Sequence, residues 1–270
     1  MEGYLWLIAL GFIVGAYGTL IGAGGGFVLV PILLLLYPDD NPEILTSISL
    51  AVVFFNASSG SWAYGRMKRI DYKSGLLFAS ATIPGAILGA LSTAYVPRRI
   101  FDGILGVLMI AASIFLILYV TKKSGERKGN YHFVINLVDK DGTAFKYSYN
   151  PLLGVGISCI IGYLSSFLGI GGGIIHVPVL VHLLNFPVHI ATATSHFILA
   201  IMALTGYVVH IVTGTFSSGV HRTIALAIGV LLGAQMGAFF SKRVHGRRII
   251  QSLAIALGFV GARVLLMAFK

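Results

Sequence analysis

Two glycine clusters interrupt long apolar segments, and glycine in such a place exposes the backbone to a ligand. The first break comprises Gly22, Gly24, Gly25 and Gly26, and the second break comprises Gly169, Gly171, Gly172 and Gly173. A helix that starts at such a break presents unpaired N–H groups and the positive end of its dipole, which together favour an anion. The alternative is that these glycines only allow membrane helices to pack closely.

Polar side chains follow each break at the start of the next apolar segment. We predict that the same anion is bound by Thr46, Ser49 and Asn56 in the first half, and by Thr192, Thr194 and Ser195 in the second. Hydroxyl and amide groups donate hydrogen bonds to oxyanions. They also form ordinary contacts between membrane helices, so a packing role stays open for each.

Four histidines fall in apolar segments of the second half: His176, His182, His196 and His210. A membrane histidine can titrate near neutral pH and couple a proton to anion movement. His176, which is close to the second break, and His196 are the candidates for this role. A neutral packing role is the alternative for each. Because no carboxylates accompany them, we expect no metal site.

Other chemistries find little support. Neither glycine cluster is followed by Gly-Lys-Ser/Thr, which excludes a P-loop. We see no carboxylate pair and no nucleophile beside a base, so we expect no enzyme, no catalytic residue and no cofactor. The apolar segments contain no Asp or Glu except Asp102 at one edge, which argues against a cation pump.

The elements that must position these residues are membrane helices. Of the 270 residues, 57% are hydrophobic and 10% are charged, whereas soluble domains carry about 25% charged residues. Continuous apolar runs in lipid fold as helices because each segment must satisfy its own backbone hydrogen bonds. We expect such runs at 3–21, 25–37, 45–65, 74–95, 100–120, 151–168, 173–184, 190–212, 221–240 and 249–269. The runs 25–37 and 173–184 are shorter than the ~20 residues of a spanning helix and indicate half-helices.

The two halves of the chain repeat. The segment GTLIGAGGGFVLVPIL (18–33) matches SSFLGIGGGIIHVPVL (165–180) at an offset of 147 residues. We therefore expect an all-α polytopic membrane protein with two repeats, 1–120 and 151–270. Each repeat has about five apolar segments, and this odd number would invert the second repeat relative to the first. Full crossings and re-entrant hairpins both stay open for the short segments.

Charge predicts the orientation in the membrane. The net charge is +10, but the basic residues lie in short segments between apolar runs, which argues against nucleic acid as a partner. Segments 66–73, 121–150 and 241–248 hold 14 of the 19 Lys and Arg residues. The positive-inside rule places these segments in the cytoplasm. Both termini are then predicted on the opposite, outer side of the membrane.

The polar segment 121–150 is expected to be a cytoplasmic linker with a β-hairpin. Two β-prone runs flank Asp139-Lys140-Asp141-Gly142, and Asp-Gly is a strong hairpin turn signal. Because an isolated hairpin is only marginally stable in water, we expect it to rest on the membrane domain or on another subunit of a homo-oligomer.

The chain resembles the sulfite exporter TauE/SafE family over nearly its whole length. The resemblance rests on GTLIGAGGGFVLVPIL with LTSISL, and on SSFLGIGGGIIHVPVL with ATATSH. It implies anion transport in the plasma (inner) membrane of a prokaryote, with sulfite, sulfoacetate and other sulfur-containing anions as substrates. By position, the paired motifs of the family fall on residues 22–26 and 169–173.

These observations favour a secondary transporter, which we expect to export a small sulfur-containing anion and to couple its movement to protons. A passive anion channel and a membrane subunit that does not transport are the alternatives.

Overall fold

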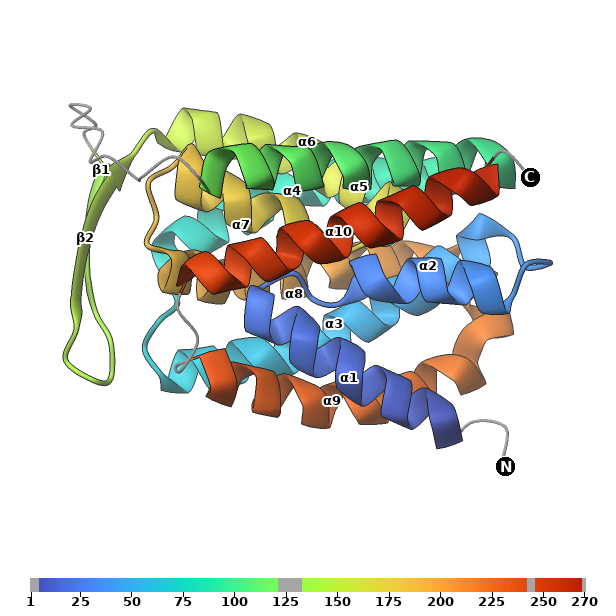
Figure 1. The fold of residues 1–270 in the computed structure, drawn as a ribbon, viewed down its shortest axis with the longest axis horizontal. Coiled ribbons are helices and arrows are strands. Elements are labelled where there is room, and N and C mark those ends of the chain that lie inside the picture. The colour runs from blue at the N-terminus through green and yellow to red at the C-terminus, as the bar shows by residue number, and fades with distance from the viewer. Residues whose placement is uncertain (1–4, 121–132, 242–245, 269–270) are drawn as a thin grey trace.

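The computed structural model describes residues 5–120, 133–241 and 246–268, and this part of the chain is mainly helical (Figure 1). In chain order the elements are α1 (Leu5–Ile21), α2 (Gly26–Leu36), α3 (Pro42–Arg66), α4 (Tyr72–Thr93), α5 (Arg98–Val120), β1 (Phe133–Val138), β2 (Ala144–Tyr149), α6 (Pro151–Leu168), α7 (Gly173–His182), α8 (Val188–Val212), the 3-10 helix η2 (Thr215–Gly219), α9 (Val220–Ser241) and α10 (Gly246–Ala268).

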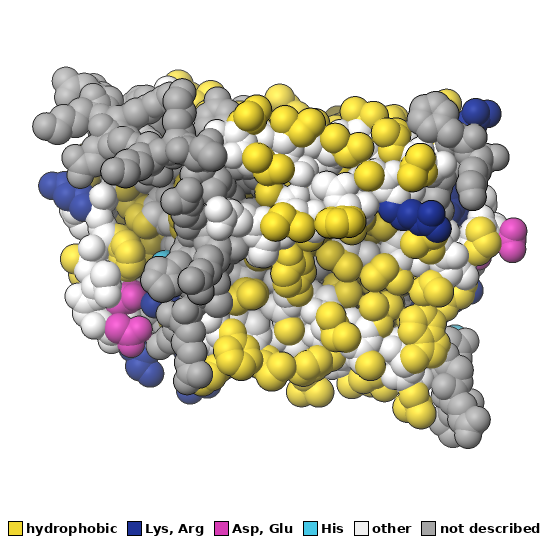
Figure 2. All heavy atoms as spheres, in the orientation of Figure 1, with side chains coloured by type: hydrophobic (Ala, Val, Ile, Leu, Met, Phe, Trp, Pro, Cys, Tyr) yellow, Lys and Arg dark blue, Asp and Glu magenta, His cyan; other side chains and the backbone are white. Residues whose placement is uncertain are grey.

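Hydropathy and length confirm a polytopic membrane protein. Five of the described helices, α3, α4, α6, α8 and α9, are long and apolar enough to cross a membrane. Hydrophobic side chains cover the middle of the face in Figure 2, whereas the charged side chains lie at its two ends. Such a band of apolar surface between two charged ends suits a bilayer. The two short helices begin at Gly26 and Gly173, within two residues of the expected runs.

Local sequence signals explain where several helices start. Asp71 precedes α4, and its carboxylate accepts a hydrogen bond of 3.1 Å from the Ser74 N–H. Asn150 caps α6 in the same way, accepting from the N–H of Leu152 at 3.0 Å, and Pro151 occupies the first helical position. Both are standard helix starts, because the side chain replaces a missing backbone partner.

Glycines allow close contact in two pairs of helices. In α4 packed on α6, a Cβ added to Gly89 would lie 2.9 Å from the Phe167 nitrogen. In α9 packed on α1, a Cβ added to Gly233 would lie 2.8 Å from the Ala16 nitrogen. Small residues of this kind are typical of membrane helix interfaces. Helices α3 and α8 pack on each other between these pairs, and α5 packs on α10.

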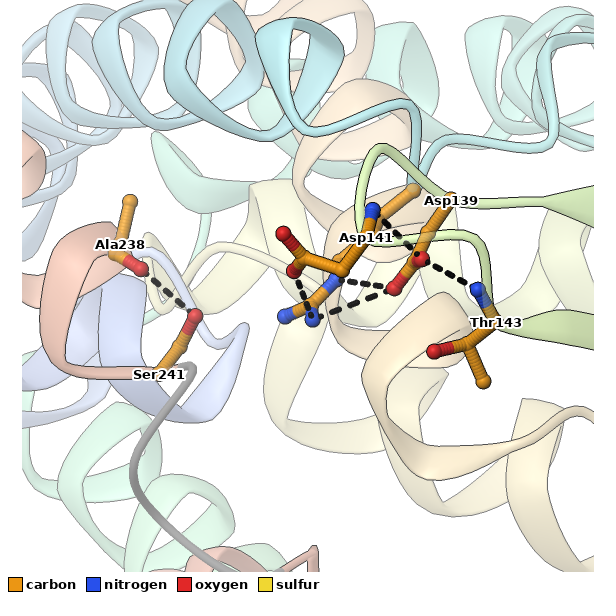
Figure 3. Close-up of polar contacts among 6 residues, drawn as sticks. Asp139, Asp141, Thr143, Ala238 and Ser241 are labelled. Carbon is orange, nitrogen blue, oxygen red and sulfur yellow. Dashed lines mark hydrogen bonds and ion pairs between the residues drawn. The ribbon is translucent and has the colours of Figure 1, made fainter.

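The two strands form an antiparallel hairpin in which Val138 faces Ala144 across the turn. Figure 3 shows the Asp139 carboxylate inside that turn, where it accepts hydrogen bonds from the N–H groups of Asp141 (3.0 Å) and Thr143 (2.9 Å). The hairpin lies at one end of the molecule, and α1 begins and α10 ends at the opposite end (Figure 1). Part of the expected cytoplasmic charge, in 121–132 and 242–245, lies outside the described residues.

Candidate functional site

The two breaks lie against each other in the buried interior. Both breaks are buried, from Gly22 to Gly26 and from Gly169 to Gly173. A Cβ added to Gly26 would lie 2.6 Å from the carbonyl oxygen of Ile170, and one added to Gly173 would lie 2.6 Å from the Cα of Ala23. The backbone of each break therefore packs directly on the backbone of the other, which only glycine permits at these positions.

The start of each short helix leaves N–H groups without helical partners. In α2, the first hydrogen bonds run from the N–H groups of Val28 and Leu29 to the Gly25 carbonyl, at 3.1 and 3.0 Å. In α7, Ile175 and His176 donate to the Gly172 carbonyl at 3.0 and 2.8 Å. Neither start has a side-chain cap. The N–H groups of the first two residues of each helix are therefore available to an anion.

The backbone at the breaks has the left-handed conformation that favours glycine. Gly24 has a φ of 75° and Gly171 a φ of 66°. These two glycines occupy matching places in the two motifs. A larger residue at either position would be strained, since left-handed backbone is costly for side chains with a Cβ.

Two predicted site residues, Ser49 and Ser195, link the central helices to the breaks. The Ser49 hydroxyl on α3 donates to the Gly169 carbonyl at 2.6 Å, and the Ser195 hydroxyl on α8 donates to the Gly22 carbonyl at 3.1 Å. The same contact thus occurs twice with the roles of the halves exchanged. Because both hydroxyl protons are already used, these serines hold the breaks in place rather than offering a free donor.

The two predicted threonines Thr46 and Thr192 also lie at the breaks, but with their methyl groups toward them. The Thr192 methyl would lie 2.8 Å from a Cβ on Gly22, and the Thr46 methyl 3.0 Å from a Cβ on Gly169. Their hydroxyls donate within their own helices, to the carbonyls of Glu43 and Val188. These two threonines therefore pack against the breaks and offer no free hydrogen-bond donor there.

Thr194 lies elsewhere. Its hydroxyl oxygen accepts a hydrogen bond of 3.0 Å from the N–H of Asp71, and its methyl group is 3.5 Å from a Cβ placed on Gly75. It therefore faces the start of α4. This separation from Thr192 follows from helix geometry, because positions two apart lie on different faces.

Asn56 and His196 form a buried polar network beside the first break. Thr19 on α1 donates to the Asn56 side-chain oxygen at 3.0 Å, and the Nε2 of His196 lies 3.1 Å from the same threonine oxygen. Tyr64 donates to the Thr19 carbonyl at 2.7 Å and packs edge-on against the His196 ring. The network joins α1, α3 and α8.

His176 lies in the first turn of α7, and its Nε2 is 3.2 Å from the Ser158 hydroxyl. Sequence reasoning missed Ser158 and also Ser165, whose hydroxyl is buried near Gly172. A signal for both exists in the sequence. They are seven residues apart on α6, a spacing that places them on one helix face.

Charge is kept away from the middle of the molecule. Among the described residues, the buried charged side chains lie in the hairpin, in the α3–α4 loop or near the start of a helix: Arg69, Asp71, Asp102 and Asp139. The described part of the chain also has no group of three or more His, Cys, Asp or Glu that could hold a metal ion. The interior around the breaks therefore offers neutral hydrogen-bond donors.

Comparisons with known proteins agree on a transporter. The family model described as sulfite exporter TauE/SafE matches residues 7–264. The chain is 33% identical to the probable membrane transporter protein YunE of Bacillus subtilis, over 97% of each chain. It is 25% identical to the probable membrane transporter protein MJ0441 of Methanocaldococcus jannaschii, over 96% of this chain and 94% of that protein. No solved structure matches the chain.

Proposed function

Because this chain belongs to the sulfite exporter TauE/SafE family and is a membrane transporter, we propose that it carries a small sulfur-containing anion. Sulfite, sulfoacetate or another organosulfonate is the substrate, and the plasma membrane of a prokaryote is the location. The observation that carries the proposal is the meeting of two uncapped helix starts, at Gly26 and Gly173, in a buried region where no described side chain is charged.

The electrostatics of this region favour an anion over a cation. Two helix N-termini contribute partial positive charge, which is worth more in a buried site than in water. An intramembrane carboxylate would be expected on a cation path. The buried carboxylates Asp71 and Asp102 instead lie at helix ends, and Asp102 is paired with Arg98 at 3.2 Å.

We infer that the two halves are inverted repeats that alternate access by rocking against each other. Two pairs of contacts support this inference, because the second member of each pair repeats the first with the halves exchanged. The contact of Gly26 with Ile170 matches that of Gly173 with Ala23. The hydrogen bond from Ser49 to Gly169 matches that from Ser195 to Gly22. Transporters of this architecture bind substrate where the repeats meet. The start of α1 and the end of α10 lie opposite the hairpin in Figure 1, which supports both termini being outside.

Export and proton coupling complete the proposal, with His176 or His196 as the residue that takes up the proton. Both side chains are buried near the breaks. A substitution of the coupling histidine should flatten the dependence of transport rate on pH, whereas the other histidine variant should keep the wild-type profile. Identical profiles for both variants and the wild type would remove proton coupling through these residues.

The function is tested by transport of labelled sulfite and sulfoacetate in proteoliposomes that contain the purified full chain. Sulfate and acetate serve as comparison anions, and liposomes without protein serve as the blank. We expect saturable transport of sulfite or an organosulfonate. Absence of transport for every anion would contradict the proposal and favour a subunit that does not transport.

The same assay separates a carrier from a passive channel. A carrier must change conformation in each cycle, so an excess of unlabelled anion on the opposite side should accelerate exchange of the label. A channel would show rates that rise linearly with concentration and no such acceleration.

A further inference from the structure

Two polar atoms near the second break have no hydrogen-bond partner although they are buried. These are the hydroxyl oxygen of Ser165 and the Nδ1 of His176, on side chains that are 0% and 1% exposed. They converge on one point, because a Cβ added to Gly172 would lie 3.2 Å from the first atom and 3.3 Å from the second. Buried polar atoms are almost always paired, so two unpaired ones at one helix start indicate a ligand.

The first break lacks these groups. At an offset of 147 residues, Gly18 stands in place of Ser165 and Leu29 in place of His176. The surroundings are otherwise alike. Val14 lies beside the N-cap Gly25 of α2, just as Ile161 lies beside Gly172 of α7. The two breaks therefore share a backbone geometry, but only at the second do a serine hydroxyl and a histidine nitrogen lie beside the N-cap glycine.

Ser158 is the side chain that can set which nitrogen of His176 carries the proton. Within the described chain, the Ser158 hydroxyl has a single hydrogen-bond partner, the His176 Nε2 at 3.2 Å. The contact fits either direction. With the hydroxyl as the donor, Nε2 accepts as an unprotonated nitrogen. In a neutral imidazole the proton then sits on Nδ1, so His176 presents an N–H donor toward Gly172.

Resting on the proposed function, we propose that the transported anion binds asymmetrically, at the second break. Ser165, the Nδ1–H of His176 and the N–H groups of Gly173 and Ile174 are its ligands, and Ser158 is a positioning residue. Every group in this set donates a hydrogen bond. The set suits a small oxyanion such as sulfite, whose oxygens accept several hydrogen bonds at once.

The test is binding of sodium sulfite to the purified full chain, measured by titration calorimetry, with folding checked by size exclusion and thermal unfolding. We expect S165A and His176→Leu, which restores the side chain of the first half, to weaken binding at least about tenfold each, or about 1.4 kcal/mol. The control S113A removes a buried hydroxyl that donates to the Ala254 carbonyl, at 2.7 Å and away from the breaks. It should bind sulfite like the wild type.

Conservative variants keep the proposal falsifiable if the larger changes impair folding. His176→Asn places an amide N–H where Nδ1–H was and cannot carry a proton, so its sulfite affinity should stay within about threefold of the wild type. Ser158→Ala should weaken binding in the wild-type background but not beside Asn at 176, where no tautomer needs to be set. Ser158→Thr keeps a hydroxyl at this position and should bind sulfite as the wild type does.

The outcomes separate two failures. If the wild type neither binds nor transports any anion, the proposed function itself is wrong. If the wild type binds sulfite and both S165A and His176→Leu bind it equally well, the transporter stands and the asymmetric site is overturned. A loss of binding in His176→Asn as large as that in His176→Leu would overturn the donor role of the imidazole.

Discussion

The phenol of Tyr147 donates a hydrogen bond of 2.8 Å to the carboxylate of Asp71, which lies 76 residues earlier in the chain. The same carboxylate accepts from the Ser74 hydroxyl at 2.5 Å, and that hydroxyl is also 2.5 Å from the phenol of Tyr149. The hairpin thus closes over a buried carboxylate that no cation neutralises within hydrogen-bond distance in the described chain. The Tyr147 phenol and the hydroxyl and N–H of Ser74 replace the water that would otherwise solvate it.

Removal of one tyrosine donor should loosen the hairpin. Tyr147→Phe leaves the Asp71 carboxylate buried with one hydrogen bond fewer, which costs about 1–3 kcal/mol. We expect a lower unfolding temperature and faster proteolysis between residues 133 and 149. Tyr95→Phe makes the same chemical change at a tyrosine that is 86% exposed and should have no effect. Equal stability of the two variants would contradict the role of this hydrogen bond.

Acid should weaken the hairpin turn through Asp139. Burial of this carboxyl raises its pKa, but the N–H groups of Thr143 and Asp141 and the Arg69 guanidinium together outweigh burial and hold the pKa below the usual 3.8. A group with a lowered pKa stabilises the fold fully above its ordinary pKa, and this stabilisation is lost as the pH falls through the lowered value. Hydrogen exchange of residues 133–149 should therefore lose protection below about pH 4. Asp139→Asn should show weaker protection with no such transition.

The hairpin should restrain movement of one half against the other. It contacts the α3–α4 loop through Arg69, which lies 3.3 Å from the Asp139 carboxylate, and the α7–α8 loop through Asn185, which donates to the Ser148 carbonyl at 3.3 Å. Tyr147 also packs on Phe186, with ring centroids 4.5 Å apart. We expect deletion of 131–149 to raise the initial transport rate in proteoliposomes, because the rocking halves lose a shared contact.

A milder variant checks the deletion. Asn185→Gly keeps the left-handed backbone of Asn185 (φ 57°) while removing the hydrogen bond to the hairpin, and should move the rate in the same direction by a smaller factor. An unchanged rate in both variants would leave the hairpin with a purely structural role.

The serines Ser49 and Ser195 should be equally important, because they make the same contact in exchanged halves. Ser49→Ala leaves the Gly169 carbonyl without this donor, and Ser195→Ala does the same to the Gly22 carbonyl. We expect each to destabilise the protein by about 1–3 kcal/mol, measured by thermal unfolding. Ser47→Ala is the control, because its hydroxyl donates within α3, to the Ile44 carbonyl at 2.7 Å. A large effect of one serine alone would argue against equivalent roles.

Alanine at the meeting point of the breaks should be far more damaging than alanine elsewhere. Gly26→Ala places a methyl group 2.6 Å from the Ile170 oxygen, and Gly173→Ala places one 2.6 Å from the Ala23 Cα. Rigid backbone cannot yield, so we expect losses above about 3 kcal/mol and little folded protein. Gly156→Ala on α6 meets nothing within 4 Å and should be neutral or stabilising by about 0.5–1 kcal/mol. Normal yields of both break variants would show that the breaks do not meet as described.

Much of the fold follows from local sequence. Apolar runs are long enough to span, the glycine clusters stop two of them, and Asp141-Gly142 predicts a turn where β1 and β2 meet. The residues of the site could not be predicted from their positions in the chain alone. The sequence places Thr192 and Thr194 together, yet they lie on different faces of α8, because a helix advances about 100° per residue.

The sequence by itself determined a polytopic helical membrane protein with two glycine breaks, since hydropathy and backbone hydrogen bonding act within each segment. Only the tertiary structure decided which groups meet at those breaks. Ser49 reaches Gly169 across 120 residues, and Tyr147 reaches Asp71 across 76. Such pairings depend on the rotation and depth at which helices pack, and a single sequence carries no local signal for either.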